Sequence, residues 1–344
     1  MLIDLPTELL LLLATFLDAD RAINALCQTS KQLYNLFNPD LYRRNLQDPE
    51  LSPLIWACQR GNVDAARKSI EEGADVRMKD KHGMEPLACA ARNGHTAVMK
   101  LLLETGQIDA DAKTTWGRTA LSHAAAKGHA DVAKLLLDTG KVNPDLPDCD
   151  GVTPLFYAAG CGHEAVVRLL LETGQVDANS RDCVGSSPLS SAASNGYHAI
   201  VKMLFETGQA DVDHKDSEGS TPLSHAAWDG HEEVMRQLLD TGQVRVDEMD
   251  DGNMTPLAAA AANGQEGALK MLLETGQVNV NSRGWDEMTP LCHAAINGHV
   301  GTVKILLGHP KTDVSLQDMR GWTALQYAMD RGHKRVAELI RSAG

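Results

Sequence analysis

Along most of the chain, short groups of apolar residues recur in a fixed order. One group has a Leu followed by a pair of alanines, as in Leu121 and Ala124-Ala125, and it ends at a glycine such as Gly128. The next group is a run of three apolar residues, as in Leu135-Leu136-Leu137. Apolar residues at helical spacing, closed by a glycine, predict two short antiparallel helices in each copy of the pattern.

The copies stay in register from residue 51 to the end of the sequence. A four-residue motif, usually Thr-Pro-Leu and one variable residue, returns after 33 residues and then seven times after 34. Its nine copies begin at Ser52, Glu85, Thr119, Thr153, Ser187, Thr221, Thr255, Thr289 and Thr323. A period of this length is typical of stacked architectures, so residues 51–344 are predicted to form an array of nine units.

The residues that flank each first helix fit this prediction. A Thr or Ser hydroxyl can accept a hydrogen bond from a backbone N–H of the first turn, and Pro suits the next position, where the N–H has no helical partner. The closing glycines, such as Gly94 and Gly230, suit a residue with positive φ. A helix pair this short cannot bury its apolar face alone, so neighbouring pairs must stack into one continuous core.

In six copies the closing glycine is followed by His, at Gly94-His95, Gly128-His129, Gly162-His163, Gly230-His231, Gly298-His299 and Gly332-His333. Together with Thr-Pro-Leu and Ala-Ala, this pattern resembles the ankyrin repeat. The resemblance implies an all-α ankyrin-repeat solenoid of helix pairs with hairpin-like fingers. It also implies a non-enzymatic binding scaffold, whose concave groove is formed by finger tips and first helices.

Three departures from the ankyrin pattern predict local differences. The spacing of 34 predicts a slightly longer loop before each finger than in the first unit. The fingers at Asp250-Asp251-Gly252-Asn253 and Gly284-Trp285-Asp286-Glu287 break the Asp-x-x-Gly pattern, so we expect them to be shaped differently. The last unit surrounds its apolar residues with Lys334, Arg335 and Glu338, which predicts a polar C-terminal cap.

Large aromatic residues gather where the ankyrin resemblance places the groove and its edge. The five tryptophans are Trp56, Trp116, Trp228, Trp285 and Trp322, and none falls in a second helix. Aromatic side chains are frequent interface anchors, so these residues are predicted to contact a protein substrate. A second series, here called the ladder, lies two residues after the Leu of each copy and includes Tyr157, Tyr327, His123, His225 and His293. For both series, packing between neighbouring repeats is the alternative interpretation.

No catalytic, metal or cofactor site is predicted. Of the 13 histidines, most belong to the repeat pattern. The ladder histidines His123, His225 and His293 lie two or more repeats apart, and packed helices are on the order of 10 Å apart, so one zinc could not bridge them. The sequence contains no Gly-rich phosphate loop and no Gly-x-Ser-x-Gly motif.

Residues 1–47 are out of phase with the repeat and are predicted to form three short helices. The apolar positions are Leu5, Pro6, Leu9, Leu10, Leu13, Leu17 and Leu26. With Thr29-Ser30-Lys31 and Leu33-Tyr34, they resemble an F-box of the form that precedes ankyrin arrays in fungal proteins. The resemblance implies docking on a Skp-type adaptor, and through it on a cullin complex of the SCF type, with these apolar residues as the adaptor contact. The alternative is an N-terminal cap that seals the first repeat.

Two residues of this segment depart from the F-box pattern. Arg21 stands where a Leu usually follows the Asp, and Leu33 stands where many F-boxes have Trp. Fewer than 50 residues rarely hold a stable core alone. We therefore expect the segment to pack either on the first repeats or on another protein.

Composition narrows the class of partner. The 344 residues include 32 Lys and Arg against 46 Asp and Glu, a net charge of −14, which disfavours nucleic acid and favours a basic protein surface. Seven cysteines without a Cys-x-x-Cys pair predict buried thiols in a reducing compartment, so we expect the chain in the cytoplasm or nucleus. We also expect it to be a monomer apart from its complex with the adaptor. The leucines of residues 9–13 are too few to span a membrane and lack a preceding positive charge, so no membrane attachment is expected.

Overall fold

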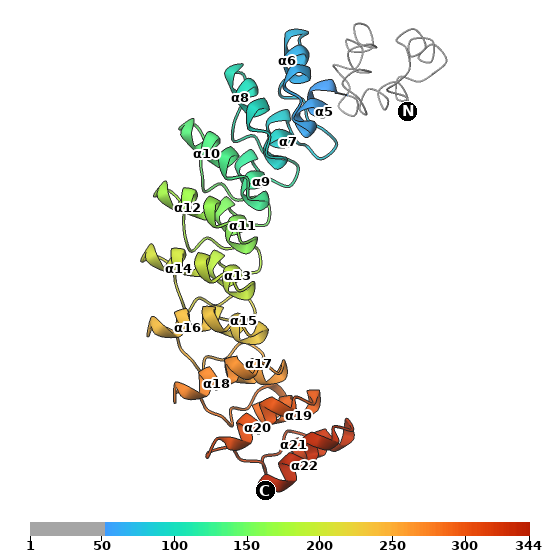
Figure 1. The fold of residues 1–344 in the computed structure, drawn as a ribbon, viewed down its shortest axis with the longest axis vertical. Helices are drawn as coiled ribbons and strands as arrows, with labels where there is room; N and C mark the ends of the chain where they lie inside the picture. Colours follow the sequence, from blue (N-terminus) through green and yellow to red (C-terminus); the bar gives the residue numbers. More distant parts are fainter. Residues whose placement is uncertain (1–51) are drawn as a thin grey trace, which may run out of the picture. The chain divides into compact units, whose positions relative to one another are not determined.

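The computed structural model describes residues 52–344, which form helix pairs and contain no β-strand (Figure 1). These residues fall into two compact units, the first ending at Cys149 and the second beginning at Asp150. Each unit is a stack of helix pairs. The predicted N-terminal helices and the predicted adaptor contacts lie outside the described residues. The all-α prediction is confirmed for the part of the chain from Ser52 onward.

The first unit contains three helix pairs. Its first helices are α5 (Pro53–Arg60), α7 (Pro86–Arg92) and α9 (Ala120–Lys127). Its second helices are α6 (Val63–Glu71), α8 (Thr96–Glu104) and α10 (Ala130–Asp138). Within this unit α7 packs between α5 and α9, and α8 packs between α6 and α10, so first and second helices form two adjacent rows.

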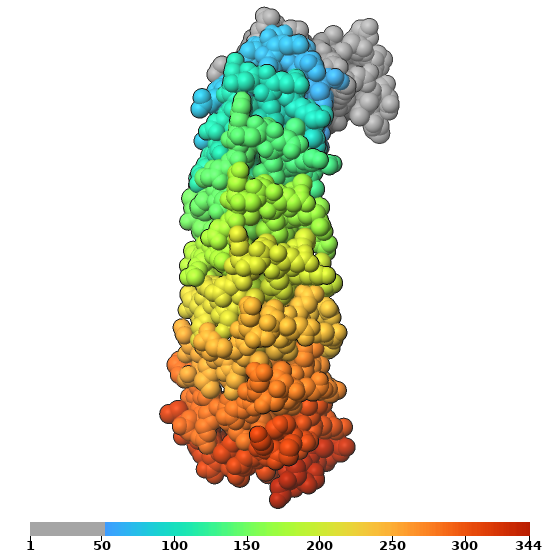
Figure 2. Space-filling model, turned by 90° about the vertical axis from the view of Figure 1, so that its left-hand side faces the viewer, coloured from blue at the N-terminus to red at the C-terminus, as the bar shows by residue number. Residues whose placement is uncertain are grey.

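The second unit contains six helix pairs. Its first helices are α11 (Pro154–Gly160), α13 (Pro188–Ser194), α15 (Pro222–Asp229), α17 (Pro256–Ala262), α19 (Pro290–Asn297) and α21 (Ala324–Asp330). Its second helices are α12 (Glu164–Glu172), α14 (His198–Glu206), α16 (Glu232–Asp240), α18 (Glu266–Glu274), α20 (Val300–Gly308) and α22 (Lys334–Ala343). A short 3₁₀ turn, η1 (Trp285–Glu287), precedes α19. Figure 2 shows the second-helix side, on which successive pairs follow one another in chain order within each unit.

The N-caps form as the sequence predicts, with one exception. In eight first helices a Ser or Thr side chain accepts a hydrogen bond from the N–H three residues on, as Thr221 Oγ1 does from Ser224 at 3.2 Å. The exception is α7, where the capping position holds Glu85 and no side-chain cap bond forms. The carboxyl of Glu85 is almost fully buried, and this burial raises its pKa.

Small residues make the close stacking of first helices possible. In α15, Leu223, Ala226 and Ala227 are all fully buried, and the same three positions are buried in the other first helices except α21. In α21, Leu325 is half-buried and Met329 is exposed. Second helices add one row of larger side chains, such as Leu204 and Leu238. Burying these side chains is favourable at roughly 25 cal/mol per Å² of apolar surface, and the two rows together form the core of each unit.

Five of the histidines that follow a closing glycine, at His95, His129, His231, His299 and His333, tie their repeat to the preceding one. The Nε2 atom of His231 lies 2.9 Å from the carbonyl oxygen of Ser194, and that of His299 lies 3.0 Å from the carbonyl oxygen of Ala262. A carbonyl oxygen can only accept, so the proton is on Nε2. Gly264 shows why glycine precedes this contact: its φ is +71°, and a Cβ there would lie 2.6 Å from Nδ1 of His299. These histidines are structural.

The longer repeat is accommodated in the loop after each second helix. Residues 72–85 separate α6 from α7, whereas residues 105–119 separate α8 from α9. Side chains in these loops bond to the next loop along: Asp111 Oδ2 accepts from the N–H of Asn143 at 2.9 Å, and Asn179 Oδ1 accepts from that of Asp211 at 2.8 Å. The loops are therefore fastened to one another within each unit, a pairing that the sequence analysis did not find.

One of the two fingers expected to differ keeps the common turn. Asn253 occupies the place of the missing glycine with φ of +57°, and Asp250 Oδ1 still accepts from the N–H of Met254 at 2.8 Å. The expectation is wrong there because Asn tolerates the left-handed region. The finger at Gly284 does differ, since both Asp286 and Glu287 have positive φ and no Asp side chain pins the turn.

Candidate protein-binding site

The fingers and first helices of each unit form one continuous face, here called the finger face. Within a typical finger, an Asp side chain fixes the turn: Asp216 Oδ1 accepts from the N–H groups of Glu218 at 3.0 Å and Ser220 at 2.9 Å. Successive finger tips are joined by backbone hydrogen bonds, such as Ser217 N–H to Val184 O at 2.9 Å. The tips therefore hold their side chains in a fixed array.

Three tryptophans expose much of their side chain on the finger face. The exposed fraction is 66% for Trp116, 46% for Trp228 and 78% for Trp285. Trp116 and Trp285 lie at finger tips, and Trp228 lies in the last turn of α15. Exposed tryptophan is costly to leave in water, and such residues are frequent anchors at protein interfaces. These three are the strongest contact candidates of the predicted set.

The other two predicted tryptophans are half-buried. Trp56 lies in α5, and Trp322 precedes α21. The ring of Trp322 packs on Tyr327, with centroids 5.1 Å apart and planes at 53°. Both therefore offer only part of their surface to a partner.

Tyr327 is inside the fold, as the packing interpretation of this series has it. Only 8% of the residue is exposed, and its hydroxyl donates a hydrogen bond to Asp318 Oδ2. Burial, followed by the bond to Asp318, raises the pKa of Tyr327 to about 12. This tyrosine holds the last finger against α21 and offers almost no contact surface.

The remaining ladder residues Tyr157, His123, His225 and His293 are half-buried. His225 Nε2 lies 2.9 Å from Asp216 Oδ2, nine residues earlier, which is the spacing of the Tyr327–Asp318 pair. At the corresponding places before His123 and His293 the chain has Thr114 and Gly284. The repeat phase could have revealed this pairing, because both members recur at fixed positions.

Two ladder histidines are neutral at physiological pH. Burial, with smaller contributions from Arg118 and Arg92, lowers the pKa of His123 to about 4. Burial likewise lowers the pKa of His293. Neither imidazole contributes positive charge to the finger face at neutral pH.

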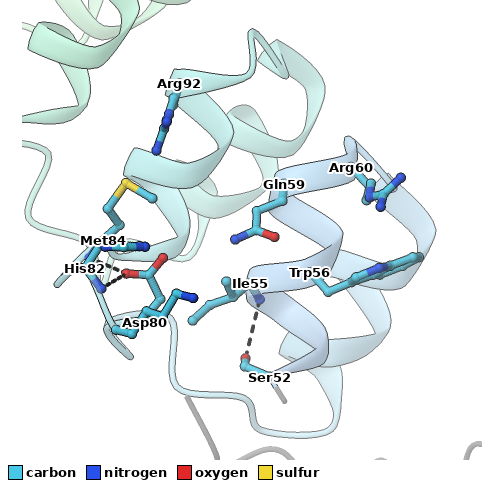
Figure 3. Close-up of a pocket in the computed structure, with 10 residues that line it drawn as sticks. Ser52, Ile55, Trp56, Gln59, Arg60, Asp80, His82, Met84 and Arg92 are labelled. Atoms are coloured by element: carbon cyan, nitrogen blue, oxygen red, sulfur yellow. Dashed lines mark hydrogen bonds between the residues drawn. The ribbon is translucent and has the colours of Figure 1, made fainter. Parts of the chain in front are cut away.

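Each unit has a pocket between a first helix and the finger that follows it. The pocket beside α5, with a volume of about 470 Å³, is the α5 pocket, shown in Figure 3. Ile55 and Gln59 of α5 line it together with Asp80 and Met84 of the finger. The pocket beside α15, with a volume of about 380 Å³, is the α15 pocket. The basic residues Arg60, Lys81 and Arg92 line the first, and the acidic residues Glu218, Asp229 and Asp250 line the second.

Residues 52–344 offer neither a metal site nor a membrane-spanning helix. They contain no group of three or more His, Cys, Asp or Glu side chains placed to hold a metal ion. They also contain no helix that is both long and apolar enough to cross a bilayer.

Comparison with solved structures supports the fold assignment. The ankyrin repeat domain of human ASB11 superposes with a TM-score of 0.60 at 30% sequence identity, covering 66% of this chain and 98% of that domain.

Curated relatives match short stretches only. The human transient receptor potential cation channel subfamily A member 1 is 39% identical over 68 residues, which is 19% of this chain and 6% of the channel. The ankyrin repeat-containing protein YIL001W of Saccharomyces cerevisiae is 36% identical over 63 residues, or 18% of this chain and 12% of that protein. Putative glutaminase 2 of Caenorhabditis elegans is 35% identical over 81 residues, which is 23% of this chain and 13% of that protein. The chain thus spans less than a fifth of each of these relatives.

The family model for ankyrin repeats, taken three copies at a time, matches nearly the whole chain. The matched segments are residues 21–113, 54–145, 106–182, 139–216, 174–247, 189–283 and 276–344. Ankyrin repeats are typically non-enzymatic binding modules, in agreement with the exposed tryptophans of the finger face. The chain belongs to the ankyrin-repeat family, and its array is a protein-binding scaffold.

Proposed function

We propose that this protein is the substrate receptor of an SCF-type ubiquitin ligase. In this proposal residues 1–47 dock a Skp-type adaptor, which connects to a cullin complex, and the finger face binds a protein substrate. The observation that carries the substrate half is the exposure of Trp116 on the finger face of the first unit and of Trp228 and Trp285 on that of the second. The adaptor half rests on the F-box-like string that begins at Leu5 and Pro6.

The first helix pair offers support for a docking role of residues 1–47. In α6, Lys68-Ser69-Ile70 stands where α8 has Leu101-Leu102-Leu103, and the buried residues of α6 are Ala65, Ala66 and Ser69. A polar terminal helix is what an array needs to stay soluble. A first helix pair of this composition is consistent with a docking role for residues 1–47.

A pull-down against a recombinant Skp-type adaptor tests the proposal. The full-length protein should bind, and the variant Leu5→Ala/Pro6→Ala/Leu9→Ala should not. Arg21→Leu is the matched variant, because it restores the residue that F-boxes usually have there and should strengthen adaptor binding. Failure of the folded parent protein to bind would remove the adaptor half of the proposal.

The second candidate is a stand-alone ankyrin scaffold or inhibitor whose N-terminal helices only cap the array. The argument in its favour is that fewer than 50 residues precede the array, and a segment of that length rarely holds a stable core alone. Deleting residues 1–47 and following thermal unfolding separates the two candidates. Unchanged melting would exclude the cap, whereas unfolding or aggregation of the array would favour it.

A further inference from the structure

The α15 pocket combines an exposed aromatic ring with several carboxylates. Trp228 and Asp229 come from α15, Glu218 from the finger before it, and Asp250 from the finger after it. Trp228 is 46% exposed although it borders a pocket of about 380 Å³. An apolar ring left open beside a hollow of this size is a surface suited to receive a side chain from outside.

Among the described residues, the carboxylates of this pocket have no cationic partner. Within residues 52–344, neither Glu218, Asp229 nor Asp250 takes part in an ion pair, whereas Lys215 and Arg245 nearby are paired with Glu248 and Asp213. Residues 150–344 carry 26 Asp and Glu against 15 Lys and Arg, a net charge of −11. The pocket therefore presents unneutralised negative charge within an acidic unit.

The position of Asp229 adds to this charge. It is the last residue of α15, and the last turn of that helix contains no basic residue. The C-terminal end of a helix carries a partial negative charge, so an Asp there is electrostatically unfavourable for the isolated protein. A cation seated between Asp229 and the helix end would remove this penalty.

Hydrogen bonds hold the pocket walls in place. His225 Nε2 lies 2.9 Å from Asp216 Oδ2, which fixes this lining residue to the finger before α15. Glu218 O accepts from the N–H of Asp251 at 2.9 Å, which joins the two flanking finger tips. A preformed pocket loses little conformational entropy when it binds.

We propose that the α15 pocket seats an arginine side chain of the protein partner, with the guanidinium over Trp228 and paired with Glu218, Asp229 or Asp250. A cation over a tryptophan face is attracted by the ring, and the planar guanidinium both stacks on aromatic rings and forms paired bonds to carboxylates. Lysine would gain the charge attraction but not the stacking. The inference rests on the proposed substrate-binding role of the finger face and specifies the chemistry of the partner.

The test uses full-length ¹⁵N-labelled protein and two capped pentapeptides. The probe is Gly-Gly-Arg-Gly-Gly, and the matched control replaces arginine by citrulline, which has the same length and a planar head but no charge. The readout is the indole N–H signal of Trp228, assigned by its loss in Trp228→Phe. We expect a saturable shift with the arginine peptide and a Kd on the order of 1 mM, with little shift for citrulline.

Charge variants decide whether the pocket is the binding site. Asp229→Asn and Glu218→Gln should each weaken binding of the arginine peptide about threefold to tenfold. Glu172→Gln removes the same charge at the exposed end of α12 and should leave binding unchanged. Equal shifts with both peptides, an equal loss in Glu172→Gln, or no saturable shift would each overturn the proposal.

This experiment is independent of partner capture. A protein that captures a substrate through its finger face but ignores the arginine peptide would retain the proposed function and lose only the pocket assignment. A protein that binds the peptide but captures no substrate or adaptor would lose the proposed function and keep the pocket.

Discussion

The α5 and α15 pockets occupy the same place in the repeat but have opposite charge. Counted from the caps Ser52 and Thr221, the third, fourth, seventh and eighth residues line both pockets. At the eighth position α5 has Arg60, whereas α15 has Asp229. One backbone framework therefore supports two different surfaces.

The difference extends to the units that contain the pockets. Residues 52–149 carry 13 Lys and Arg against 13 Asp and Glu, whereas residues 150–344 have a net charge of −11. In the first unit every first helix ends with a basic residue in its last turn, at Arg60, Arg92 and Lys127, and no first helix of the second unit does. The two units are thus suited to different parts of a partner.

The position of tryptophan also separates the two pockets. In α5 it is the fourth residue after the cap, Trp56, and it is half-buried, whereas in α15 it is the seventh, Trp228, and nearly half of it is exposed. Both positions line their pocket, but the residue at the fourth is half-buried and the residue at the seventh is exposed. We infer that tryptophan serves packing at the first place and recognition at the second.

The largest expected effect concerns the exposed tryptophans. Trp116→Ala/Trp228→Ala/Trp285→Ala should weaken substrate binding by about 4 kcal/mol or more, the scale of combined hot-spot losses. Each change should alter the free energy of unfolding by only about 0.5 kcal/mol, because the side chains are exposed. Isothermal titration with a captured substrate and urea unfolding measure the two quantities. Testing Trp116 apart from the other two shows which unit supplies the contact, and full affinity in the triple variant would contradict the assignment.

The second prediction compares how much Trp56 and Trp228 each contribute to the free energy of unfolding. Trp56→Ala should lower the free energy of unfolding by about 2 kcal/mol, less than the full cost for a buried aromatic because the ring is half-buried. Trp228→Ala should change it by less than about 0.5 kcal/mol. Urea titration followed by circular dichroism compares them. Equal losses would show that the two positions have the same structural role.

Much of the fold could be predicted because the repeat constrains its own geometry. Thr221, Pro222 and Gly230 each act through local backbone requirements, and nine copies in phase make the helix boundaries clear. The turn at Asp250 could not be predicted from the Asp-x-x-Gly pattern because Asn253 takes the place of the glycine. Only the backbone conformation of Asn253 shows that the turn is kept.

The candidate site was less predictable because exposure depends on neighbours. Tyr327 and His225 occupy the same repeat position, yet Tyr327 is buried against Asp318 whereas His225 borders an open pocket. The acidic lining of the α15 pocket comes from two fingers and a helix end, so no single motif encodes it. The polar array of loop side chains such as Asp111 was missed for the same reason.

A charge reversal sharpens the comparison of the two pockets. Asp229→Arg gives the α15 pocket the residue that α5 has at the same position. It should weaken binding of the arginine peptide tenfold or more, about 1.4 kcal/mol, and leave the free energy of unfolding unchanged or slightly higher, since a cation suits a helix C-terminus. Peptide titration and urea unfolding check both expectations. Unchanged peptide affinity would place the binding site elsewhere on the acidic unit.

The smallest effect concerns the one first helix without a cap bond. Burial raises the pKa of Glu85 above its ordinary value of 4.5, although Lys79 lies 4.0 Å away and acts in the opposite direction. A carboxyl whose pKa is higher in the folded chain than in the unfolded chain favours folding only while it is protonated. That contribution is lost as the pH rises from the pKa of the unfolded chain through the higher pKa of the folded chain. At neutral pH, ionised Glu85 therefore opposes folding.

Two variants separate charge from capping at this position. Glu85→Gln removes only the charge, so its advantage over the parent protein should be present at pH 7 and should shrink as the pH falls toward 4. Glu85→Thr also restores the cap that the eight other first helices have, which should add about 1 kcal/mol at every pH. Urea unfolding of the three proteins between pH 4 and pH 7 measures both contributions. If Glu85→Gln were less stable than the parent at pH 7, the attraction to Lys79 would outweigh the cost of burial, and the exception in α7 would be a stabilising one.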